Sequence, residues 1–385
     1  MEATALLKII SGGENSKVQF KENITNAVSI AQEMVAFANS QGGLLIIGVK
    51  DKTGEIVGLD FPNIQRINNL LATASNELVK PSIYVFTETV EVQGQHLLIC
   101  QIQEGIKKPY RDKDGVVWIK TASDKRKVIS NEEEARLLQI GGYMQAEEQI
   151  FFDSDWKYID FELFKNFYEK KYDEKIEDVK DLPMIFENLN LAKGNKFNLA
   201  GILLFGKTVT RYFPLNQIIG ISFFGNEVTG INYRDSENIE GNFRKLFTEG
   251  MAFIKRNIKK VQNSKSFNST GDPEIPLIVF EELLTNALIH RDYFVQNNIR
   301  IFIFDNRIEI ISPGKLPNSL TVEKIKYGIS IKRNPTLASF AFDLINFRGI
   351  GSGIRRAIQH YPAIEFINDE IIEEFKVIIY RPLLS

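Results

Sequence analysis

The chain has 385 residues, of which 44% are hydrophobic and 25% are charged, as is usual for globular proteins. This length predicts two or three domains rather than one core. The formal net charge of -2 excludes a general attraction to nucleic acid, so any such contact must come from a local basic patch. One cysteine excludes an intrachain disulfide, and three histidines leave little for a zinc site.

The N-terminal residues lack the basic start and the apolar length of a secretory signal peptide. No apolar run approaches the roughly 18 residues that a membrane-spanning helix needs. We therefore expect a cytoplasmic protein that makes no membrane contact.

The first 145 residues alternate short strands and helices. Val18 and Phe20 alternate with polar residues and predict a strand, and apolar residues at helical spacing over 24–38 predict a helix. The further predicted elements are a buried strand at 44–49, a helix at about 62–79, a hairpin around 93–94, a strand at 116–121 and a helix after the capping box 130–133.

The rest of the chain has the same mixed character, interrupted by a linker at 263–276 that is rich in Ser, Asn, Gly and Pro. Before the linker we predict helices at 160–172 and about 237–262 and strands at 201–206 and 218–225. After it we predict a helix at about 275–289, a hairpin at 297–312, two more helices and a final strand at 374–382.

Residues 200–208, AGILLFGKT, have the spacing of a phosphate-binding loop, from Gly201 to Lys207 and the threonine after it. Such a loop wraps backbone N–H groups around phosphates between a strand and a helix. Here the four wrapping positions are bulky and apolar, and the following segment contains Pro214 and leads to another strand. We therefore interpret 201–206 as a buried strand that ends in a turn.

Residues 290–297 match a kinase catalytic loop in letters, with Asp292 and Asn297 at the key positions. A kinase also needs an Asp-Phe-Gly motif downstream and a glycine-rich loop with its lysine upstream, and the sequence contains neither. We exclude a kinase, and expect His290 and Tyr293 to pack at the end of a helix.

Glu282 and Asn286 are four residues apart and therefore share one face of a predicted helix. The carboxylate could position a water molecule and the amide a magnesium ion. Downstream, Gly349, Gly351 and Gly353 precede another helix, where alternating glycines expose backbone N–H groups to an anion. In this order, with the hairpin that ends in ISPGKLP between them, the two signals support each other.

Residues from about 274 to 381 resemble the C-terminal ATPase-like domain of RecG-related bacterial transcriptional regulators. The resemblance rests on ELLTNALIHRDY, RIEIISPGKLP, RNPTLASF and GIGSGI. That domain is a divergent relative of the gyrase, Hsp90 and histidine-kinase (GHKL) ATP-binding fold. The resemblance implies a Bergerat-type α/β sandwich that binds ATP and Mg²⁺.

The same resemblance assigns roles to individual residues. Glu282 would be the catalytic residue if ATP is hydrolysed, Asn286 would contact the metal, and Gly314 would belong to the first glycine box. The second glycine box would contain Gly349, Gly351 and Gly353. ATP-binding relatives hold the adenine amino group with an aspartate in the first box. This chain has Ser312 there, and serine cannot supply a carboxylate acceptor.

The first 145 residues resemble the AlbA-like domain of the same bacterial proteins and of Schlafen proteins, through GENSKVQFKEN, AFANSQGGLLIIGVKD and KKPYRDKDGVVWIKTASD. In Schlafen-type nucleases two glutamates and an aspartate hold a divalent metal, and the resemblance places this set at Glu14, Gln19 and Asp51. Carboxylates suit Mg²⁺ or Mn²⁺, which would polarise the phosphate. Gln19 lacks the charge, so we expect weaker metal binding, while Lys21 on the same face suits a phosphate contact.

Residues 107–128 carry basic side chains interleaved with Tyr110 and Trp118, which could contact phosphates and stack on unpaired bases. The alternative is a solvated hairpin edge that lysines protect from aggregation. The resemblance favours nucleic-acid contact. With Lys21, the predicted contact residues are Lys107, Lys108, Arg111, Lys120, Lys125, Arg126 and Lys127.

These observations predict a multidomain α+β protein. Its parts would be an AlbA-like nucleic-acid-binding domain at 1–148, an α+β connector at 149–270 and a GHKL-like domain at 271–385. We expect a nucleic-acid-binding regulator that senses ATP and forms homo-oligomers, because one module offers a small basic surface. The alternatives are a metal-dependent nuclease acting through Glu14 and Asp51, and a protein-interaction module.

Overall fold

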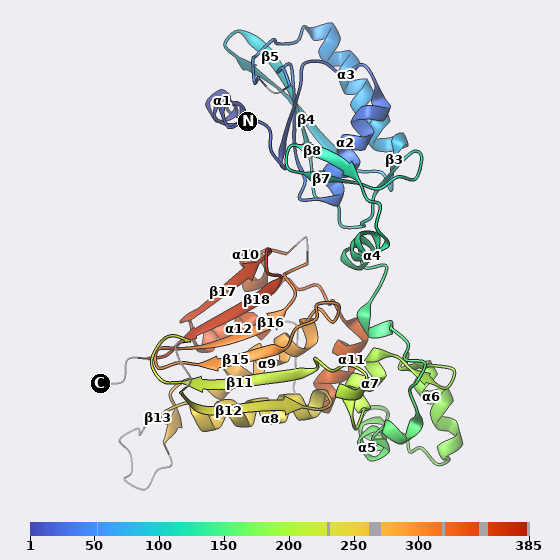
Figure 1. Ribbon diagram of the computed structural model, residues 1–385, viewed down its shortest axis with the longest axis vertical. Coiled ribbons are helices and arrows are strands. Elements are labelled where there is room, and N and C mark those ends of the chain that lie inside the picture. Colours follow the sequence, from blue (N-terminus) through green and yellow to red (C-terminus); the bar gives the residue numbers. More distant parts are fainter. Residues whose placement is uncertain (52, 229–231, 262–270, 318–319, 346–352, 383–385) are drawn as a thin grey trace. The chain divides into compact units, whose positions relative to one another are not determined.

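The computed structural model describes the whole chain except residues 52, 229–231, 262–270, 318–319, 346–352 and 383–385. The chain divides into two compact units, unit 1 at Met1–Met144 and unit 2 at Gln145–Ser385 (Figure 1). Both units mix helices and strands, which confirms the predicted α+β class. Within the described part of the chain, no helix is long and apolar enough to cross a membrane.

Unit 1 is built on a four-stranded sheet in the order β1-β2-β5-β4. The strands are β1 (Val18–Lys21), β2 (Gly43–Ile47), β5 (Gln95–Ile102) and β4 (Val85–Val92). β1 runs parallel to β2, and the other neighbours are antiparallel. Alternate side chains of β2 enter different cores, Leu45 on one face and Ile46 on the other, so both faces are covered.

Helix α1 (Ala3–Ser11) covers one face of this sheet, and α2 (Ala27–Asn39) and α3 (Phe61–Thr73) cover the other. Ser130 caps α4 (Asn131–Ile140) by accepting a hydrogen bond from the Glu133 N–H at 3.1 Å, as the capping box predicts. The remaining elements of unit 1 are a π-helical turn at Ala74–Leu78 and the strands β3 (Val79–Lys80), β6 (Arg111–Asp112), β7 (Trp118–Thr121) and β8 (Asp124–Lys127).

Unit 2 contains a six-stranded sheet in the order β12-β11-β15-β16-β18-β17. These strands are β11 (Gln217–Phe223), β12 (Tyr233–Glu240), β15 (Ile299–Ile303), β16 (Arg307–Pro313), β17 (Ile364–Asp369) and β18 (Glu374–Tyr380). β11 runs parallel to β15, and the other neighbouring pairs are antiparallel. The sheet therefore joins residues that we assigned to the connector with residues that we assigned to the C-terminal domain.

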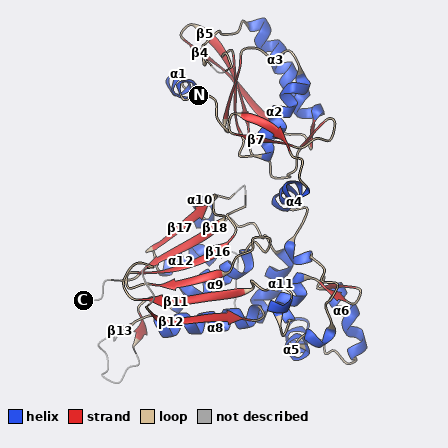
Figure 2. Ribbon diagram, viewed as in Figure 1, coloured by secondary structure: helices blue, strands red, loops and turns tan. Residues whose placement is uncertain are grey.

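Helices α8 (Phe243–Asn257), α9 (Leu277–His290) and α12 (Gly353–His360) lie on one face of this sheet (Figure 2). Beside the sheet, α5 (Phe161–Tyr172), α6 (Leu182–Asn188) and α7 (Leu199–Phe205) enclose an aromatic cluster that includes Phe164, Phe186 and Phe205. The other described elements are the helices α10 (Val322–Lys326) and α11 (Pro335–Leu344), the short strands β9 (Ala192–Lys193), β10 (Lys196–Phe197), β13 (Lys260–Val261) and β14 (Asp272–Pro273), and 3₁₀ turns at Ala146–Glu148, Trp156–Tyr158, Val179–Asp181 and Val209–Arg211.

The segment with the phosphate-loop spacing is helix α7, so the predicted strand at 201–206 is wrong. Every residue of α7 is buried, and a helix buried on all sides has no amphipathic period to distinguish it from a buried strand. The rejection of the phosphate loop holds, because Gly201 lies inside the helix. A Cβ there would collide with the Leu191 carbonyl oxygen, so the glycine serves close packing.

The predicted helix at 237–262 begins later, at Phe243, because β12 occupies the preceding residues. Asn242 marks the true start, since its side chain accepts a hydrogen bond from the Lys245 N–H at 3.1 Å. The strand β17 was not predicted, and it pairs with β18 at the edge of the sheet.

Replacing Asn198 with alanine should destabilise unit 2 by about 2 kcal/mol. The buried amide caps α7 by accepting from the Gly201 N–H at 2.9 Å and donates to the Asn190 carbonyl at 2.7 Å. Urea unfolding can be followed by the fluorescence of Trp156, which packs on Phe197, in a Trp118→Phe background.

The matched control is Asn188→Ala, at an exposed position in the last turn of α6, which should change stability by less than about 0.5 kcal/mol. Equal effects of the two alanine substitutions would contradict the capping role of Asn198.

Candidate functional site

Unit 2 contains a cavity of about 220 Å³ between the helices and one face of the sheet. Its wall includes Glu282 and Asn286 of α9, Gly314 just after β16 and Gly353 at the start of α12. Three segments that are distant in the sequence therefore meet at one place. Two predicted members of the second glycine box, Gly349 and Gly351, lie outside the described residues.

Glu282 lies at the contact between α9 and α12 and is 2% exposed. Its Oε1 atom lies 2.8 Å from the Nε atom of Arg356 on α12. Burial raises the pKa of the Glu282 carboxyl, and the positive charge of Arg356 opposes that rise. A Cβ at Gly353 would lie 2.4 Å from the Glu282 Oε2 atom, so a larger residue there would displace the carboxylate.

Asn286 and Thr285 supply polar groups to the same cavity. The Asn286 amide nitrogen would lie 3.1 Å from a Cβ at Gly353, so the amide faces the start of α12. Thr285 is 2% exposed, and its hydroxyl has no hydrogen-bond partner among the described residues. Buried polar groups are normally hydrogen-bonded, so this hydroxyl is an exception in the wall of the cavity.

Ser312 occupies the position where ATP-binding relatives carry an aspartate. It is buried and donates a hydrogen bond to the Ala287 carbonyl oxygen at 3.0 Å, so its hydroxyl hydrogen is already used by the fold. Gly314 has a φ of +97°, which a residue with a side chain rarely adopts. The cavity wall beyond these residues is mainly apolar and includes Ile310, Leu316, Leu320, Ile325, Phe366 and Val377.

Three basic residues also line the cavity, Lys315, Lys332 and Arg333. Arg333 has a structural role, because its guanidinium donates to the His290 carbonyl at 3.0 Å and to the Lys315 carbonyl at 2.6 Å. Lys332 is exposed and Lys315 is half-buried, so their ammonium groups can approach a bound anion.

In the segment 290–297, which matches a kinase catalytic loop in sequence, Arg291 and Tyr293 pack in the core. Arg291 is 1% exposed and lies against the rings of Phe213 and Tyr293, each at 5.1 Å. Tyr293 is buried and donates to the Leu288 carbonyl at 3.2 Å. Our expectation missed one feature of this segment, namely that His290 lines the cavity.

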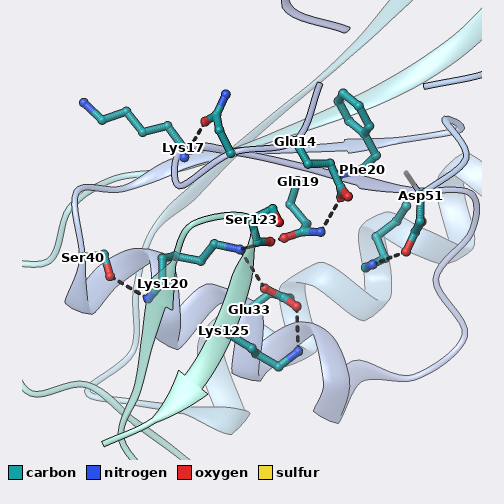
Figure 3. Close-up of polar contacts among 12 residues, drawn as sticks. Glu14, Lys17, Gln19, Phe20, Glu33, Ser40, Asp51, Lys120, Ser123 and Lys125 are labelled. Atoms are coloured by element: carbon teal, nitrogen blue, oxygen red, sulfur yellow. Dashed lines mark hydrogen bonds and ion pairs between the residues drawn. The ribbon is translucent and has the colours of Figure 1, made fainter. Parts of the chain in front are cut away.

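In unit 1, Gln19 lies between Glu14 and Lys120 (Figure 3). Its amide donates to the Glu14 Oε1 atom, which also accepts from the Phe20 N–H at 2.9 Å. The amide oxygen of Gln19 accepts from the Lys120 ammonium at 2.7 Å. Gln19 thus links the predicted carboxylate to a lysine 101 positions away in the sequence.

Glu33 of α2 completes this polar cluster and was not predicted. It is 5% exposed, its Oε1 atom lies 2.6 Å from the Lys125 ammonium, and its Oε2 atom lies 3.7 Å from the Lys120 ammonium. Desolvation lowers the pKa of Lys120, and the charge of Glu33 opposes that change. We call Glu14, Gln19, Glu33, Lys120 and Lys125 the Lys120 cluster.

Asp51, the third predicted metal ligand, is exposed and pairs with the Lys21 ammonium at 2.5 Å (Figure 3). Over the described ranges of the chain, no three His, Cys, Asp or Glu side chains are placed to hold a metal ion together. The residues of unit 1 therefore do not fit the metal site that the Schlafen resemblance implies.

The predicted nucleic-acid contacts differ widely in exposure. Lys108 and Lys120 are buried, and Lys108 pairs with Glu104 at 2.6 Å, so these two predictions need correction. Tyr110 is also buried and cannot stack on a base. The sequence gives no sign of this, because a strand edge and a buried turn can both be rich in lysine.

The other predicted basic residues lie nearer the surface. Arg111 pairs with Glu134 and Arg126 with Glu133, while Lys125 is tied to Glu33. Lys107 and Lys127 are exposed and form no ion pair with another described residue. Lys127 lies 5.4 Å from the half-buried ring of Trp118.

Two family models match the chain, one in its N-terminal part and one in its C-terminal part. Residues 14–129 match the family model described as Schlafen, AlbA_2, and residues 296–379 match the one described as "Putative ATP-dependent DNA helicase recG C-terminal". The two matches agree with the predicted domain architecture, an AlbA-like domain in the N-terminal part and a RecG-related domain in the C-terminal part.

Individual relatives are more distant. A 73-residue segment is 40% identical to an uncharacterized ATP-binding protein of Ureaplasma parvum, and it covers 18% of this chain and 21% of that protein. The DIP2311 protein of Corynebacterium diphtheriae superposes on 99% of this chain and 81% of its own, with 19% identity and a TM-score of 0.47.

The N-terminal domain of a RecG-related protein from Nitrosomonas europaea superposes on 34% of this chain and 96% of its own. Its identity is 25% and its TM-score is 0.24. Both superpositions are too loose to establish a shared function.

His290 should make the stability of unit 2 depend on pH. Burial in the cavity wall, together with the charges of Arg333 and Lys332, lowers its pKa to about 4. The unfolded chain takes up this proton near pH 6.5, whereas the folded chain does not until about pH 4. Stability should therefore fall as the pH falls from about 6.5 to 4, and less steeply in a His290→Gln variant.

Urea unfolding at several pH values, with an NMR titration of the histidine resonances, measures both quantities. An imidazole resonance that is lost in the His290→Gln variant and titrates near pH 6.5 would contradict the prediction.

Proposed function

We propose that this protein is a nucleotide-responsive nucleic-acid-binding regulator. Unit 2 would bind ATP with Mg²⁺ in its cavity, and unit 1 would bind nucleic acid. The observation that carries the proposal is the meeting of Glu282, Asn286, Gly314 and Gly353 around one cavity. Homo-oligomerisation belongs to the same proposal, because the basic surface of one unit 1 is small.

The chemistry of the cavity suits a nucleotide. Asn286 offers an amide oxygen to a magnesium ion, which neutralises phosphate charge when it is bound. Lys315 and Lys332 can approach phosphates, and the start of α12 at Gly353 presents backbone N–H groups to an anion. The apolar wall suits a base.

Two features favour binding over turnover and weaken the selectivity for adenine. Glu282 is held in an ion pair with Arg356, so its carboxylate serves the contact between α9 and α12 instead of positioning a water molecule. Ser312 has no carboxylate that could accept a hydrogen bond from the adenine amino group, and its own hydroxyl donates to the Ala287 carbonyl oxygen. We therefore expect slow hydrolysis, and affinities for ATP and GTP within about tenfold, which corresponds to less than about 1.4 kcal/mol.

The support for nucleic-acid binding comes from unit 1. Its match to the Schlafen AlbA_2 model is accompanied by the exposed cations Lys107, Arg126 and Lys127. The ring of Trp118 beside Lys127 offers a partly accessible stacking surface. The nuclease alternative is less favoured, because Gln19 breaks the acidic set and Asp51 is paired with Lys21.

Asn286→Ala should weaken the binding of Mg·ATP at least tenfold, because it removes the proposed metal-contacting amide. Isothermal titration calorimetry on the full chain measures the change, with GTP titrated in parallel.

Asn257→Ala is the matched control, since Asn257 on α8 donates to Asp235 at 2.7 Å and does not line the cavity. Tight ATP binding that survives Asn286→Ala would place the nucleotide elsewhere, and the absence of binding by the unaltered protein would refute the nucleotide site.

Reversing Lys107, Arg126 and Lys127 to glutamate should lower nucleic-acid affinity at least tenfold at about 0.1 M salt. It should also flatten the plot of log affinity against log salt by up to about three units, because each lost phosphate contact contributes about one. Fluorescence anisotropy with labelled tRNA, single-stranded DNA and duplex DNA identifies the preferred nucleic acid.

The control reverses the exposed residues Arg244, Lys255 and Lys259 of unit 2, which changes the net charge by the same amount. Equal losses in the two triple variants would indicate an effect of net charge alone and would remove unit 1 as the binding surface.

A further inference from the structure

The Lys120 cluster is arranged around one ammonium group (Figure 3). The side chain of Lys120 is fully buried. Its Nζ atom donates to the Gln19 Oε1 atom at 2.7 Å and to the Ser123 carbonyl at 3.1 Å, and it lies 3.7 Å from the Glu33 Oε2 atom. Oxygen atoms from β1, from α2 and from the β7–β8 turn therefore surround a single positive charge.

The charges of the cluster balance. Glu14 and Glu33 are two carboxylates, and Lys120 and Lys125 are two ammonium groups, while Gln19 is neutral. Burying a charge is costly unless an opposite charge or hydrogen bonds compensate it. A divalent ion added to this balanced set would bring two uncompensated positive charges.

The position of Lys120 matters as much as its charge. A metal ion bound by Gln19 and Glu33 would have to lie within about 2.0–2.6 Å of their oxygen atoms. The ammonium of Lys120 already contacts the Gln19 oxygen, and it lies 3.7 Å from the Glu33 Oε2 atom, which accepts no hydrogen bond from the described residues. The ammonium and a metal ion cannot share this space.

We propose that Lys120 is the resident cation of this cluster and takes the place that a divalent metal ion would occupy between Gln19 and Glu33. The unaltered protein then binds no metal here. Lys120 instead acts as a positioning residue, which fixes the β7–β8 hairpin against β1 and α2. That hairpin carries Arg126 and Lys127, so the cluster also fixes the strand that bears these two cationic side chains.

The test removes the lysine and restores the missing carboxylate. In the double variant Gln19→Glu/Lys120→Met, three carboxylates and one ammonium remain in the cluster. Titration of Mn²⁺ into the full chain, followed by the EPR signal of free Mn²⁺, should show at least tenfold tighter binding by this variant than by the unaltered protein. Circular dichroism and Trp118 fluorescence report whether unit 1 is folded.

The matched control is Gln19→Glu/Lys125→Met. It has the same formal charge and also removes a lysine from Glu33, but it leaves the Lys120 ammonium in place. Gln19→Glu alone is the second control, and its new carboxylate should pair with Lys120. Neither control should gain Mn²⁺ affinity, because the lysine still blocks the position.

Three results would overturn the proposal. The first is Mn²⁺ binding by the unaltered protein that Glu14→Ala abolishes. The second is a folded Gln19→Glu/Lys120→Met variant without tighter Mn²⁺ binding, and the third is an equal gain in the Lys125 control. If Gln19→Glu/Lys120→Met does not fold, Gln19→Glu decides, because a gain with Lys120 present contradicts the proposal and no gain supports it. These readouts use neither nucleotide nor nucleic acid, so their outcome is independent of the proposed function.

Discussion

The contact between the start of α12 and the middle of α9 is the constraint on which the cavity of unit 2 depends. At Gly353 a Cβ would lie 2.4 Å from the Glu282 Oε2 atom, so a larger residue would displace the carboxylate that joins the two helices. The Arg356–Glu282 ion pair then holds the same two helices one turn further along α12. Because the carboxylate is almost fully buried, its charge requires this partner, and so the electrostatics and the packing fix the same geometry.

Unit 1 also contains a buried carboxylate whose charge needs a partner, and there the partners are lysines. Its buried carboxylate, Glu33, is neutralised by lysines from a hairpin about 90 residues away in the sequence, and a glutamine links one of these lysines to Glu14. Hydrogen bonds to charged groups are stronger than neutral ones, especially out of water. The arrangement therefore joins sheet, helix and hairpin through side chains, in a place where no backbone pairing connects the three elements.

Much of the fold and part of the candidate site could be predicted from the sequence. The spacing of Glu282 and Asn286 is a local helical property, and it placed both side chains at the cavity. The roles of Glu33 and Lys120 could not be predicted, because whether a lysine is solvated or buried depends on which distant segment covers it. Helix α7 was taken for a strand because complete burial removes the periodicity that separates the two.

The order of strands in the large sheet has a consequence for how the chain folds. β18 lies between β16 and β17, and β11 pairs with β15 across about 80 residues. Such non-local pairings lose the entropy of a long loop before the hydrogen bonds and packing of the paired strands can compensate it, so assembly of this sheet should be slow. During synthesis, one edge of β16 stays unpaired until residues 374–380 have been made and can pair with it. An unpaired strand edge can aggregate, so a chaperone would be most useful in that interval.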